Sequence, residues 1–202
     1  GMEPLTTQKH TYAAAFVNAE APEYLVIEDA FPNGRPALEK VGVYFTDRDT
    51  VNDTERMKVT TCLNPLHTAL ALYGCLLGYA TIAEEMQDPE LVRLVRGIGE
   101  KEGLKVLKHP RILDPKCFLE EVFTERLPNP YMPDTPQRIA TDTSQKIPVR
   151  YGETLKAYAP DLSELHYIPL AIAGWFRYLL GKDDQLEPME VSPDPMLASL
   201  TE

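Results

Sequence analysis

The stretch that decides the fold runs from Asn64 to Ala80 and reads NPLHTALALYGCLLGYA. Asn64 followed by Pro65 is a typical helix start, because an asparagine side chain can cap the first turn and proline is tolerated at the first helical position. The positions that follow are apolar on nearly every side, whereas a surface helix would carry one polar face. The sequence therefore predicts a helix from Pro65 to about Ala80 at the centre of a mostly helical protein.

The remainder of the chain supplies helices to surround this one. Asp88 and Asp114 each precede a proline, a pattern that favours a helix start. Ser163 is placed to cap a late helix that Gly181 would close, and the proline-rich segment 128–134 predicts an extended loop. Helices are expected over 89–107, over 115–127, around Arg138, over 151–158 and over 164–180.

The part of the chain before the central helix has a different character. It is rich in proline and in β-branched or aromatic residues, and it predicts short strands over 24–28 and 41–45 with a turn over 31–36 between them. We therefore predict a mainly α fold, a multi-helix domain with a small extended or β N-terminal portion. The expected division is an N-terminal arm over 1–23, a helical domain over 24–182 and an acidic C-terminal tail over 183–202.

Composition narrows the classes of partner. The 202 residues carry a formal net charge of −11, which argues against nucleic acid or an anionic membrane surface. The longest apolar stretches are too short to span a bilayer, and the N-terminus lacks a signal-peptide pattern. The histidines lack the spacing of a zinc site, so no metal is expected. A cytoplasmic location with reduced thiols is predicted by the odd number and wide spacing of the cysteines, Cys62, Cys75 and Cys117.

Polar groups of four kinds enter the central helix together over residues 55–67, ERMKVTTCLNPLH. Burying polar groups is costly unless they are satisfied, so such a cluster indicates a site. Lys58 could serve as a general base only if burial or nearby cations lower its pKa. The alternative is a surface lysine that pairs with Glu55 three residues earlier. Asn64 could likewise be no more than the helix cap.

His67 would lie in the first turn of the central helix, where the positive helix end disfavours an imidazolium. A neutral imidazole there could donate or accept a hydrogen bond to a hydroxyl or carbonyl group. The alternative is a buried histidine satisfied by the backbone. Ala71, Gly74 and Gly78 fall near the same stripe as His67, which leaves space for another backbone or for a ligand.

Two further clusters could join this one. Arg138 and Lys146 lie eight residues apart and could bind the oxygens or the carboxylate of a sugar, the arginine through its bidentate fork. The alternative for this pair is a solvated helix end. The segment 27–36, IEDAFPNGRP, suits a tight and rigid loop near a partner or ligand.

Taken together, these clusters resemble the C-terminal half of the polyol-specific long-chain dehydrogenases, a family that includes mannitol 2-dehydrogenase, fructuronate reductase (D-mannonate oxidoreductase) and tagaturonate reductase. The resemblance extends from about Tyr24 to Pro148. The matching elements, in chain order, are Val26-Ile27-Glu28-Asp29 with Gly34-Arg35-Pro36, Glu55-x-x-Lys58, Leu63-Asn64-x-x-His67, Gly78-Tyr79, Asp88-Pro89, and Arg138 with Lys146 eight residues later.

The resemblance implies a metal-independent, NAD(P)-dependent oxidoreductase with Lys58 as the catalytic acid and base. Asn64 and His67 would bind and polarise the reacting oxygen and stabilise developing alkoxide charge. Glu55 would relay or gate the proton that leaves Lys58.

The same resemblance implies a substrate. Arg138 and Lys146 would hold the far end of an open-chain sugar, and the helical domain over 24–182 would be the substrate-binding and catalytic domain. The implied reaction interconverts a keto-sugar acid and its polyol acid, of the fructuronate/D-mannonate type. The alternatives are a mannitol 2-dehydrogenase-like polyol domain and a non-catalytic binding or assembly module, in which the polar residues would not converge on one cleft.

The sequence departs from the family pattern in two ways. The family lysine lies five residues before the asparagine, whereas Lys58 precedes Asn64 by six, so a bulge around Thr60–Thr61 is needed to restore the position of the amine. The sequence also contains no GxGxxG or Walker-type loop. The resemblance therefore implies that NAD(P) is bound mainly by a Rossmann domain that this chain does not contain. We expect the chain alone to fold but not to turn over its substrate.

Overall fold

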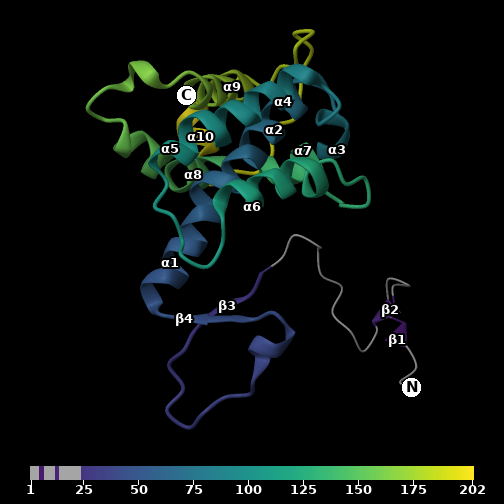
Figure 1. Ribbon diagram of the computed structural model, residues 1–202. Helices are drawn as coiled ribbons and strands as arrows, with labels where there is room; N and C mark the ends of the chain where they lie inside the picture. Colours follow the sequence, from purple (N-terminus) through teal and green to yellow (C-terminus); the bar gives the residue numbers. More distant parts are fainter. Residues whose placement is uncertain (1–4, 7–11, 14–23) are drawn as a thin grey trace.

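The computed structural model describes residues 5–6, 12–13 and 24–202, and it confirms the predicted mainly α fold with a small β portion. Figure 1 shows a body of helices gathered around α2 (Asn64–Leu77), with α1 (Arg48–Met57) leading away from it. At the far end of α1, strand β3 (Val26–Glu28) pairs in parallel with β4 (Tyr44–Thr46). The arm expected over 1–23 lies largely outside the described residues.

The other elements surround α2 or lead to it. The α-helices, in chain order, are α3 (Ile82–Glu85), α4 (Pro89–Arg96), α5 (Leu104–Val106), α6 (Pro115–Glu121), α7 (Pro136–Ala140), α8 (Thr143–Ala157), α9 (Tyr167–Leu179) and α10 (Leu197–Thr201). Three segments are π-helical, namely η2 (Lys58–Cys62), η3 (Gly97–Gly103) and η4 (Val122–Arg126). Short 3-10 helices form η1 (Leu38–Val41) and η5 (Leu162–Glu164), and β1 (Leu5–Thr6) pairs antiparallel with β2 (Tyr12–Ala13).

The predicted central helix is confirmed. Helix α2 packs against α3, α4, α7, α8 and α9, and it forms the centre of the hydrophobic core. Because its neighbours cover it on several sides, its apolar residues are needed all round rather than on one stripe. Its fully buried side chains are Leu66, Ala69, Leu70, Ala71 and Leu72.

The start of α2 differs from the prediction. Asn64 was expected to cap the helix, but it is the first helical residue, and no side chain caps this end. The cause is η2, which leads directly into α2 with only Leu63 leaving the helical path, at φ −137° and ψ −61°. The side-chain amide of Asn64 is therefore not used as a helix cap.

The π-helical segments interrupt runs that the sequence predicts as continuous helices. Helix α4 continues through η3 into α5, and α6 continues into η4. A π-helical turn inserts an extra residue and shifts the side chains that follow it. The bulge expected around Thr60–Thr61 is present as η2, in which the Thr60 hydroxyl donates to the Arg56 carbonyl.

The start of α9 is fixed by a residue far away in the sequence. Ser163 was predicted to cap this helix, but Asp161 caps the short helix η5 instead, and α9 begins only at Tyr167. The buried Glu102 carboxylate accepts hydrogen bonds of 2.5–2.8 Å from the backbone N–H groups of residues 166, 167 and 168. A carboxylate is favoured at a helix N-terminus, where these donors otherwise lack partners.

The glycine stripe of α2 is filled by protein rather than by a ligand. A Cβ placed on Gly74 would lie 2.2 Å from a carboxyl oxygen of Glu85 and 2.7 Å from Pro136. Glu85 has no exposed surface, and neither carboxyl oxygen has a hydrogen-bond partner. Burial raises the pKa of Glu85 to about 9, so this side chain is a neutral acid at pH 7.

Polar contacts hold two outer segments of the structure, residues 27–36 and 183–202. In the segment 27–36, the Arg35 guanidinium pairs with Asp29 and Glu39 and lies 3.3 Å from the centre of the Phe45 ring. The segment 183–202 runs along the helical body, where the Asp194 carboxylate accepts hydrogen bonds from the backbone and hydroxyl of Ser144. The residues expected as an acidic tail therefore contact the helical body directly.

We expect Glu102→Ala to lower the free energy of unfolding by about 3 kcal/mol, because it leaves three backbone donors at the start of α9 without an acceptor. Glu102→Gln should cost less, since its amide oxygen can still accept. Urea unfolding measures both effects. Glu100→Ala, which removes a partly exposed carboxylate from the same segment, is the control and should change little. An equal loss in the control would contradict this account.

Glu85 predicts a pH dependence of stability. In the unfolded chain this carboxyl loses its proton near pH 4.5, as an ordinary glutamate does, whereas in the folded chain it keeps the proton until about pH 9. At this group the unfolded state therefore binds fewer protons over this range, and the Glu85 contribution to stability falls as pH rises from about 5 to 9. Glu85→Gln should remove this slope and stabilise the fold at pH 7 by about 3 kcal/mol or less. Urea unfolding at pH 5 and pH 8 tests this, and parallel slopes for both proteins would refute it.

Candidate functional site

The candidate site lies at the start of α2, where this helix meets α7 and α8. Arg138 in α7 shares the Asp134 carboxylate with His67, and Arg150 in α8, whose charge acts on Lys146, contacts the Asn64 carbonyl. The start of α7 is fixed by local sequence. Thr135 caps this helix and Pro136 begins it, directly after the proline-rich loop.

A buried carboxylate, that of Asp134, connects the polar groups. Its Oδ2 lies 2.9 Å from Nη1 of Arg126, at the end of η4, and its Oδ1 accepts from Nη2 of Arg138. The same Oδ2 lies 3.7 Å from Nε2 of His67. Side-chain exposure is 6% for Asp134 and 10% for Arg126, but 60% for Arg138. Arg138 is thus held at one side of its guanidinium while the remainder faces solvent.

His67 is a neutral imidazole. Its side chain is 12% exposed, and Nε2 is buried without a hydrogen-bond partner. Desolvation by burial, followed by the charge of Arg126, lowers the pKa of His67 to about 3, although Asp134 acts in the opposite direction. The ring can therefore donate or accept hydrogen bonds near neutral pH, but it does not carry charge.

Arg150 adds a further cation on the α8 side. Its Nη1 donates to the Asn64 carbonyl at 3.2 Å and to the Thr68 hydroxyl at 2.7 Å. Both partners are neutral, so this contact does not neutralise the guanidinium. Arg150 therefore holds the first turn of α2 and contributes positive charge beside His67.

Lys146 is half-buried and bound to the end of α7. Its ammonium donates to the carbonyls of Ile139 and Thr141, two groups left open where that helix ends. Desolvation by burial, reinforced by the charge of Arg150, lowers the pKa of Lys146. One of its three N–H donors remains for a ligand.

Lys58 and Glu55 lie on the segment that enters α2. Lys58 is half-buried at the start of η2, against which α8 packs, and Glu55 is exposed one turn earlier. No ion pair joins the two side chains, and neither the Lys58 ammonium nor the Asn64 amide is hydrogen-bonded to any residue that the structure describes. The surface pair of Glu55 with Lys58, the alternative that the sequence left open, is therefore not formed. Within the same residues, no hydrogen bond joins Lys58 to His67 either.

The structure adds three residues to those predicted from sequence, namely Arg126, Asp134 and Arg150. Arg126 could have been noticed as the single charged residue facing the core in the apolar pattern Phe118, Leu119, Val122, Phe123 and Leu127. Asp134 and Arg150 gave no comparable signal, because an acid before a turn and an arginine within a helix are ordinary surface patterns.

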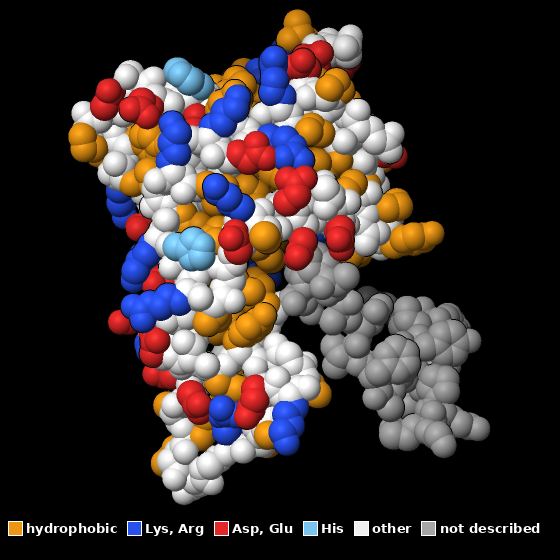
Figure 2. Space-filling view, in the orientation of Figure 1, with side chains coloured by type: hydrophobic (Ala, Val, Ile, Leu, Met, Phe, Trp, Pro, Cys, Tyr) orange, Lys and Arg blue, Asp and Glu red, His pale blue; other side chains and the backbone are white. Residues whose placement is uncertain are grey.

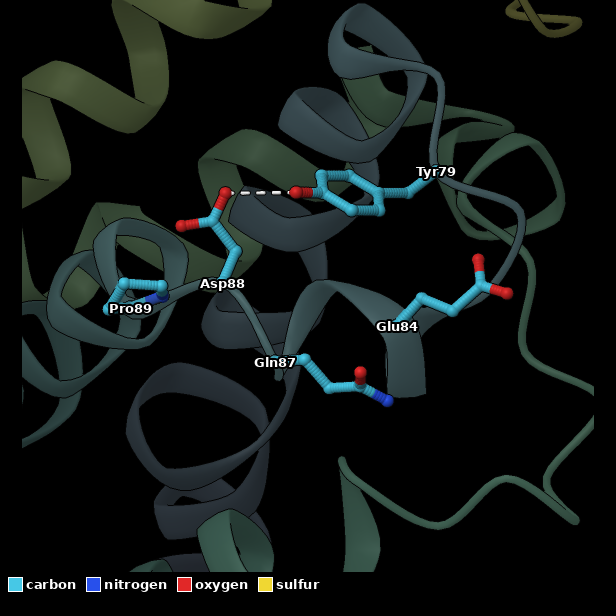
Figure 3. Close-up of a pocket in the computed structure, with 5 residues that line it drawn as sticks. All are labelled: Tyr79, Glu84, Gln87, Asp88 and Pro89. Atoms are coloured by element: carbon cyan, nitrogen blue, oxygen red, sulfur yellow. Dashed lines mark hydrogen bonds between the residues drawn. The ribbon is translucent and has the colours of Figure 1, made fainter.

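A surface hollow lies at the end of α2 opposite the candidate site, and none of the predicted site residues lines it. Figure 3 shows Tyr79 and Asp88 meeting across it, where the Tyr79 hydroxyl donates to the carboxylate at 2.9 Å. This bond ties the end of α2 to the cap of α4, so the Gly78-Tyr79 and Asp88-Pro89 motifs have a structural role here. The lining residues are Tyr79, Glu84, Gln87, Asp88 and Pro89.

The surface gives little further direction. Figure 2 shows Lys and Arg side chains interspersed with Asp and Glu over this face of the helical body. In the described part of the chain, no three His, Cys, Asp or Glu side chains are grouped as metal ligands would be. Over the same residues, none of the helices has the length and apolar character needed to cross a membrane.

The family model and the individual relatives that match this sequence agree on one protein family. Residues 50–202 match the family described as mannitol dehydrogenase C-terminal domain. The chain is 63% identical over 206 aligned residues to a D-mannonate oxidoreductase of Thermotoga maritima, covering 99% of this chain and 38% of the relative. It is 33% identical over 197 aligned residues to a D-mannonate oxidoreductase of Escherichia coli, covering 98% of this chain and 40% of that protein.

A solved structure has the same fold. The mannitol 2-dehydrogenase of Pseudomonas fluorescens, in its ternary complex with NAD and D-mannitol, superposes with a TM-score of 0.76 at 34% identity. The match covers 87% of this chain and 35% of the other. The chain thus spans about two fifths or less of the length of each of these relatives.

The environment of His67 predicts an unusual titration. Between pH 8 and pH 4 the ring signals of His67 should not shift in an NMR titration of the folded chain, because the folded pKa is about 3. In urea the same ring should titrate near pH 6.5, as an ordinary histidine does. At this ring the unfolded state therefore binds more protons, and the His67 contribution to stability falls as pH drops below about 6.5, opposite in sign to the Glu85 contribution. His67→Gln assigns the signals and should reduce that slope. A titration midpoint of His67 near pH 6 in the folded chain would contradict its description as a buried, neutral imidazole.

Proposed function

The chain belongs to the mannitol dehydrogenase C-terminal domain family, and we propose on that premise that it is the substrate-binding and catalytic domain of an NAD(P)-dependent oxidoreductase. The proposed reaction interconverts a keto-sugar acid and its polyol acid, of the fructuronate/D-mannonate type. The observation that supports this proposal is a buried, neutral His67 near the start of α2 that shares the Asp134 carboxylate with the exposed Arg138. Residues 24–182 would form the domain, and the segment 183–202 packs against it.

Lys58 is proposed as the acid and base. It is half-buried, and its ammonium makes no hydrogen bond within the described chain. The π-helical turn η2 supplies the extra residue between this lysine and Asn64. In oxidation Lys58 would take the proton from the reacting hydroxyl group, and Glu55, exposed one turn earlier, would pass that proton to solvent.

Asn64 and His67 are proposed to hold the reacting end of the substrate. The Asn64 amide makes no hydrogen bond within the described chain, and the His67 ring is uncharged. A preorganised amide donor stabilises negative charge that develops on the substrate oxygen, and it needs no proton transfer to do so. This leaves proton transfer to Lys58.

The charges around the site favour an acidic substrate. Among the described residues, Arg126, Arg138 and Arg150 lie close enough to His67 to lower its pKa, whereas the Asp134 carboxylate raises it. Arg138 keeps 60% of its side chain exposed and Arg150 donates to neutral groups, so these two cations can attract an anion. A sugar carboxylate would be attracted here, with the exposed side of Arg138 offering a bidentate contact and Lys146 one further donor.

The dinucleotide would be held mainly elsewhere. The sequence contains no glycine-rich phosphate loop, so the residues of this chain do not form a dinucleotide site of the usual kind. When bound, NAD(P) would supply or accept the hydride. We propose that a Rossmann domain brings the nicotinamide to the open side of the site, next to Lys58 and Asn64.

A mannitol 2-dehydrogenase-like function is the second candidate, since the Pseudomonas fluorescens relative was solved with D-mannitol. The two candidates differ at the far end of the substrate. The exposed guanidinium of Arg138 and that of Arg150, which donates to neutral groups, suit a carboxylate better than an uncharged polyol, and we therefore place the sugar acid first.

The test joins this chain to the part of the Thermotoga maritima relative that it does not match and follows NADH consumption with fructuronate. We expect turnover by the joined protein and none by the chain alone. Lys58→Ala should lower kcat by about 100-fold or more, because general acid–base catalysis is lost. Lys108→Ala is the matched control, since this exposed lysine pairs with Asp53 and should leave kcat unchanged.

A panel of fructuronate, tagaturonate and fructose identifies the substrate. Preference for fructose would favour the mannitol-type alternative over the sugar acid. Full activity of Lys58→Ala in the joined protein would reject the proposed role of this lysine.

A further inference from the structure

The Asp134 carboxylate is buried and lies close to charged or polar groups from three other residues. Its side chain is 6% exposed and receives groups from three elements, with Arg126 ending η4, Arg138 in α7 and His67 in α2. Its own backbone carbonyl accepts a 3.1 Å hydrogen bond from the N–H of Ile82, which anchors the loop at this point. A carboxylate held in this way has a fixed position relative to the His67 ring.

The two nitrogens of that ring have different surroundings. Nε2 is fully buried, has no hydrogen-bond partner and lies 3.7 Å from Oδ2 of Asp134. The His67 side chain as a whole is 12% exposed, and within the described chain no hydrogen bond is formed at Nδ1. With Nε2 buried, Nδ1 is the ring nitrogen left for a ligand.

A neutral imidazole carries one proton, and the charges decide where it resides. With the proton on Nε2, the ring presents a donor to the Asp134 carboxylate. With the proton on Nδ1, the lone pair of Nε2 would face that carboxylate and the two would repel each other. Among the described residues, the other charged groups that act on the ring, Arg126, Arg138 and Arg150, are cations and supply no competing acceptor.

We propose that Asp134 is a positioning residue that holds His67 in the Nε2–H tautomer, so that Nδ1 accepts a hydrogen bond from a substrate hydroxyl group. The role of His67 in the site is then to accept rather than to donate, and Asn64 supplies the donor to the reacting oxygen. A carboxylate fixing the tautomer of a working histidine is an established physical device. The substrate half of this statement rests on the proposed function, whereas the tautomer is a property of the chain itself.

The tautomer can be read directly from the 202-residue chain with ¹⁵N-labelled histidine. Long-range ¹H–¹⁵N spectra at pH 7 distinguish a protonated ring nitrogen from one with a lone pair, and His67→Gln assigns the signals. We expect a protonated Nε2 and an unprotonated Nδ1 in the native chain. A protonated Nδ1 would overturn the proposal.

Asp134→Asn tests the cause. The asparagine oxygen would stay with the arginines, so its NH₂ group would face Nε2 and favour the opposite tautomer. We expect the native pattern to be lost, with Nδ1 gaining the proton in most or all molecules. An unchanged pattern in folded Asp134→Asn would refute the role of the carboxylate.

Two further variants separate this role from folding. Asp134→Glu keeps the charge and should retain the native tautomer, which also provides the test if Asp134→Asn does not fold. Loss of the native tautomer in folded Asp134→Glu would count against the proposal. Asp88→Asn removes a carboxylate bound to Tyr79 at the other end of α2 and should leave His67 unchanged. A change there would show that the tautomer responds to general loosening and would overturn the specific role of Asp134.

Addition of D-mannonate to the labelled native chain separates the two proposals. A shift confined to Nδ1 supports both. An Nε2–H tautomer without any response to D-mannonate would count against the proposed substrate and would leave the positioning role of Asp134 standing.

Discussion

The structure of the site depends on one buried carboxylate among several cations. Asp134 places one negative charge between the guanidinium groups of Arg126 and Arg138 and beside the His67 ring. With it, three elements that are distant in sequence are drawn to the start of α2. A buried ion pair of this kind adds little net stability in general, but breaking it is costly. Its value here lies in the fixed geometry that it imposes.

The π-helical turns are the second structural device. Each lies at the end of an α-helix and shifts the next residues by one position, so that Lys58 begins η2, Arg126 ends η4 and Glu102 lies in η3. The segments η2 and η3 also touch, since a Cβ on Gly103 would lie 2.7 Å from the Thr61 side chain. The glycine allows this approach, and the extra turn of η2 is thereby packed against a second irregular segment rather than exposed.

Local signals in the sequence were sufficient for the main helices. The apolar run after Asn64 predicted α2, and the Asp-Pro pairs predicted the starts of α4 and α6, where Asp88 and Asp114 do cap the backbone. Three features that the sequence did not predict share one cause, which is contact between distant residues. Glu102 caps α9 from 64 residues away, Glu85 fills the space beside Gly74, and Asp134 gathers partners from three elements. Spacing along the chain carries no record of such contacts.

In the proposed site, burial assigns hydrogen bonding and proton transfer to different residues. A histidine is the usual choice for proton exchange at neutral pH, yet His67 is surrounded by guanidinium groups and loses its proton near pH 3. Such a ring is useful for hydrogen bonding and unsuited to acid–base work, so the proton must pass through another group. Lys58, half-buried and outside the arginine cluster, is the predicted residue whose ammonium has no hydrogen-bond partner in the described chain. The same cations that disable His67 as a base favour a negatively charged substrate, so under the proposed function substrate choice and the assignment of the base have one electrostatic origin.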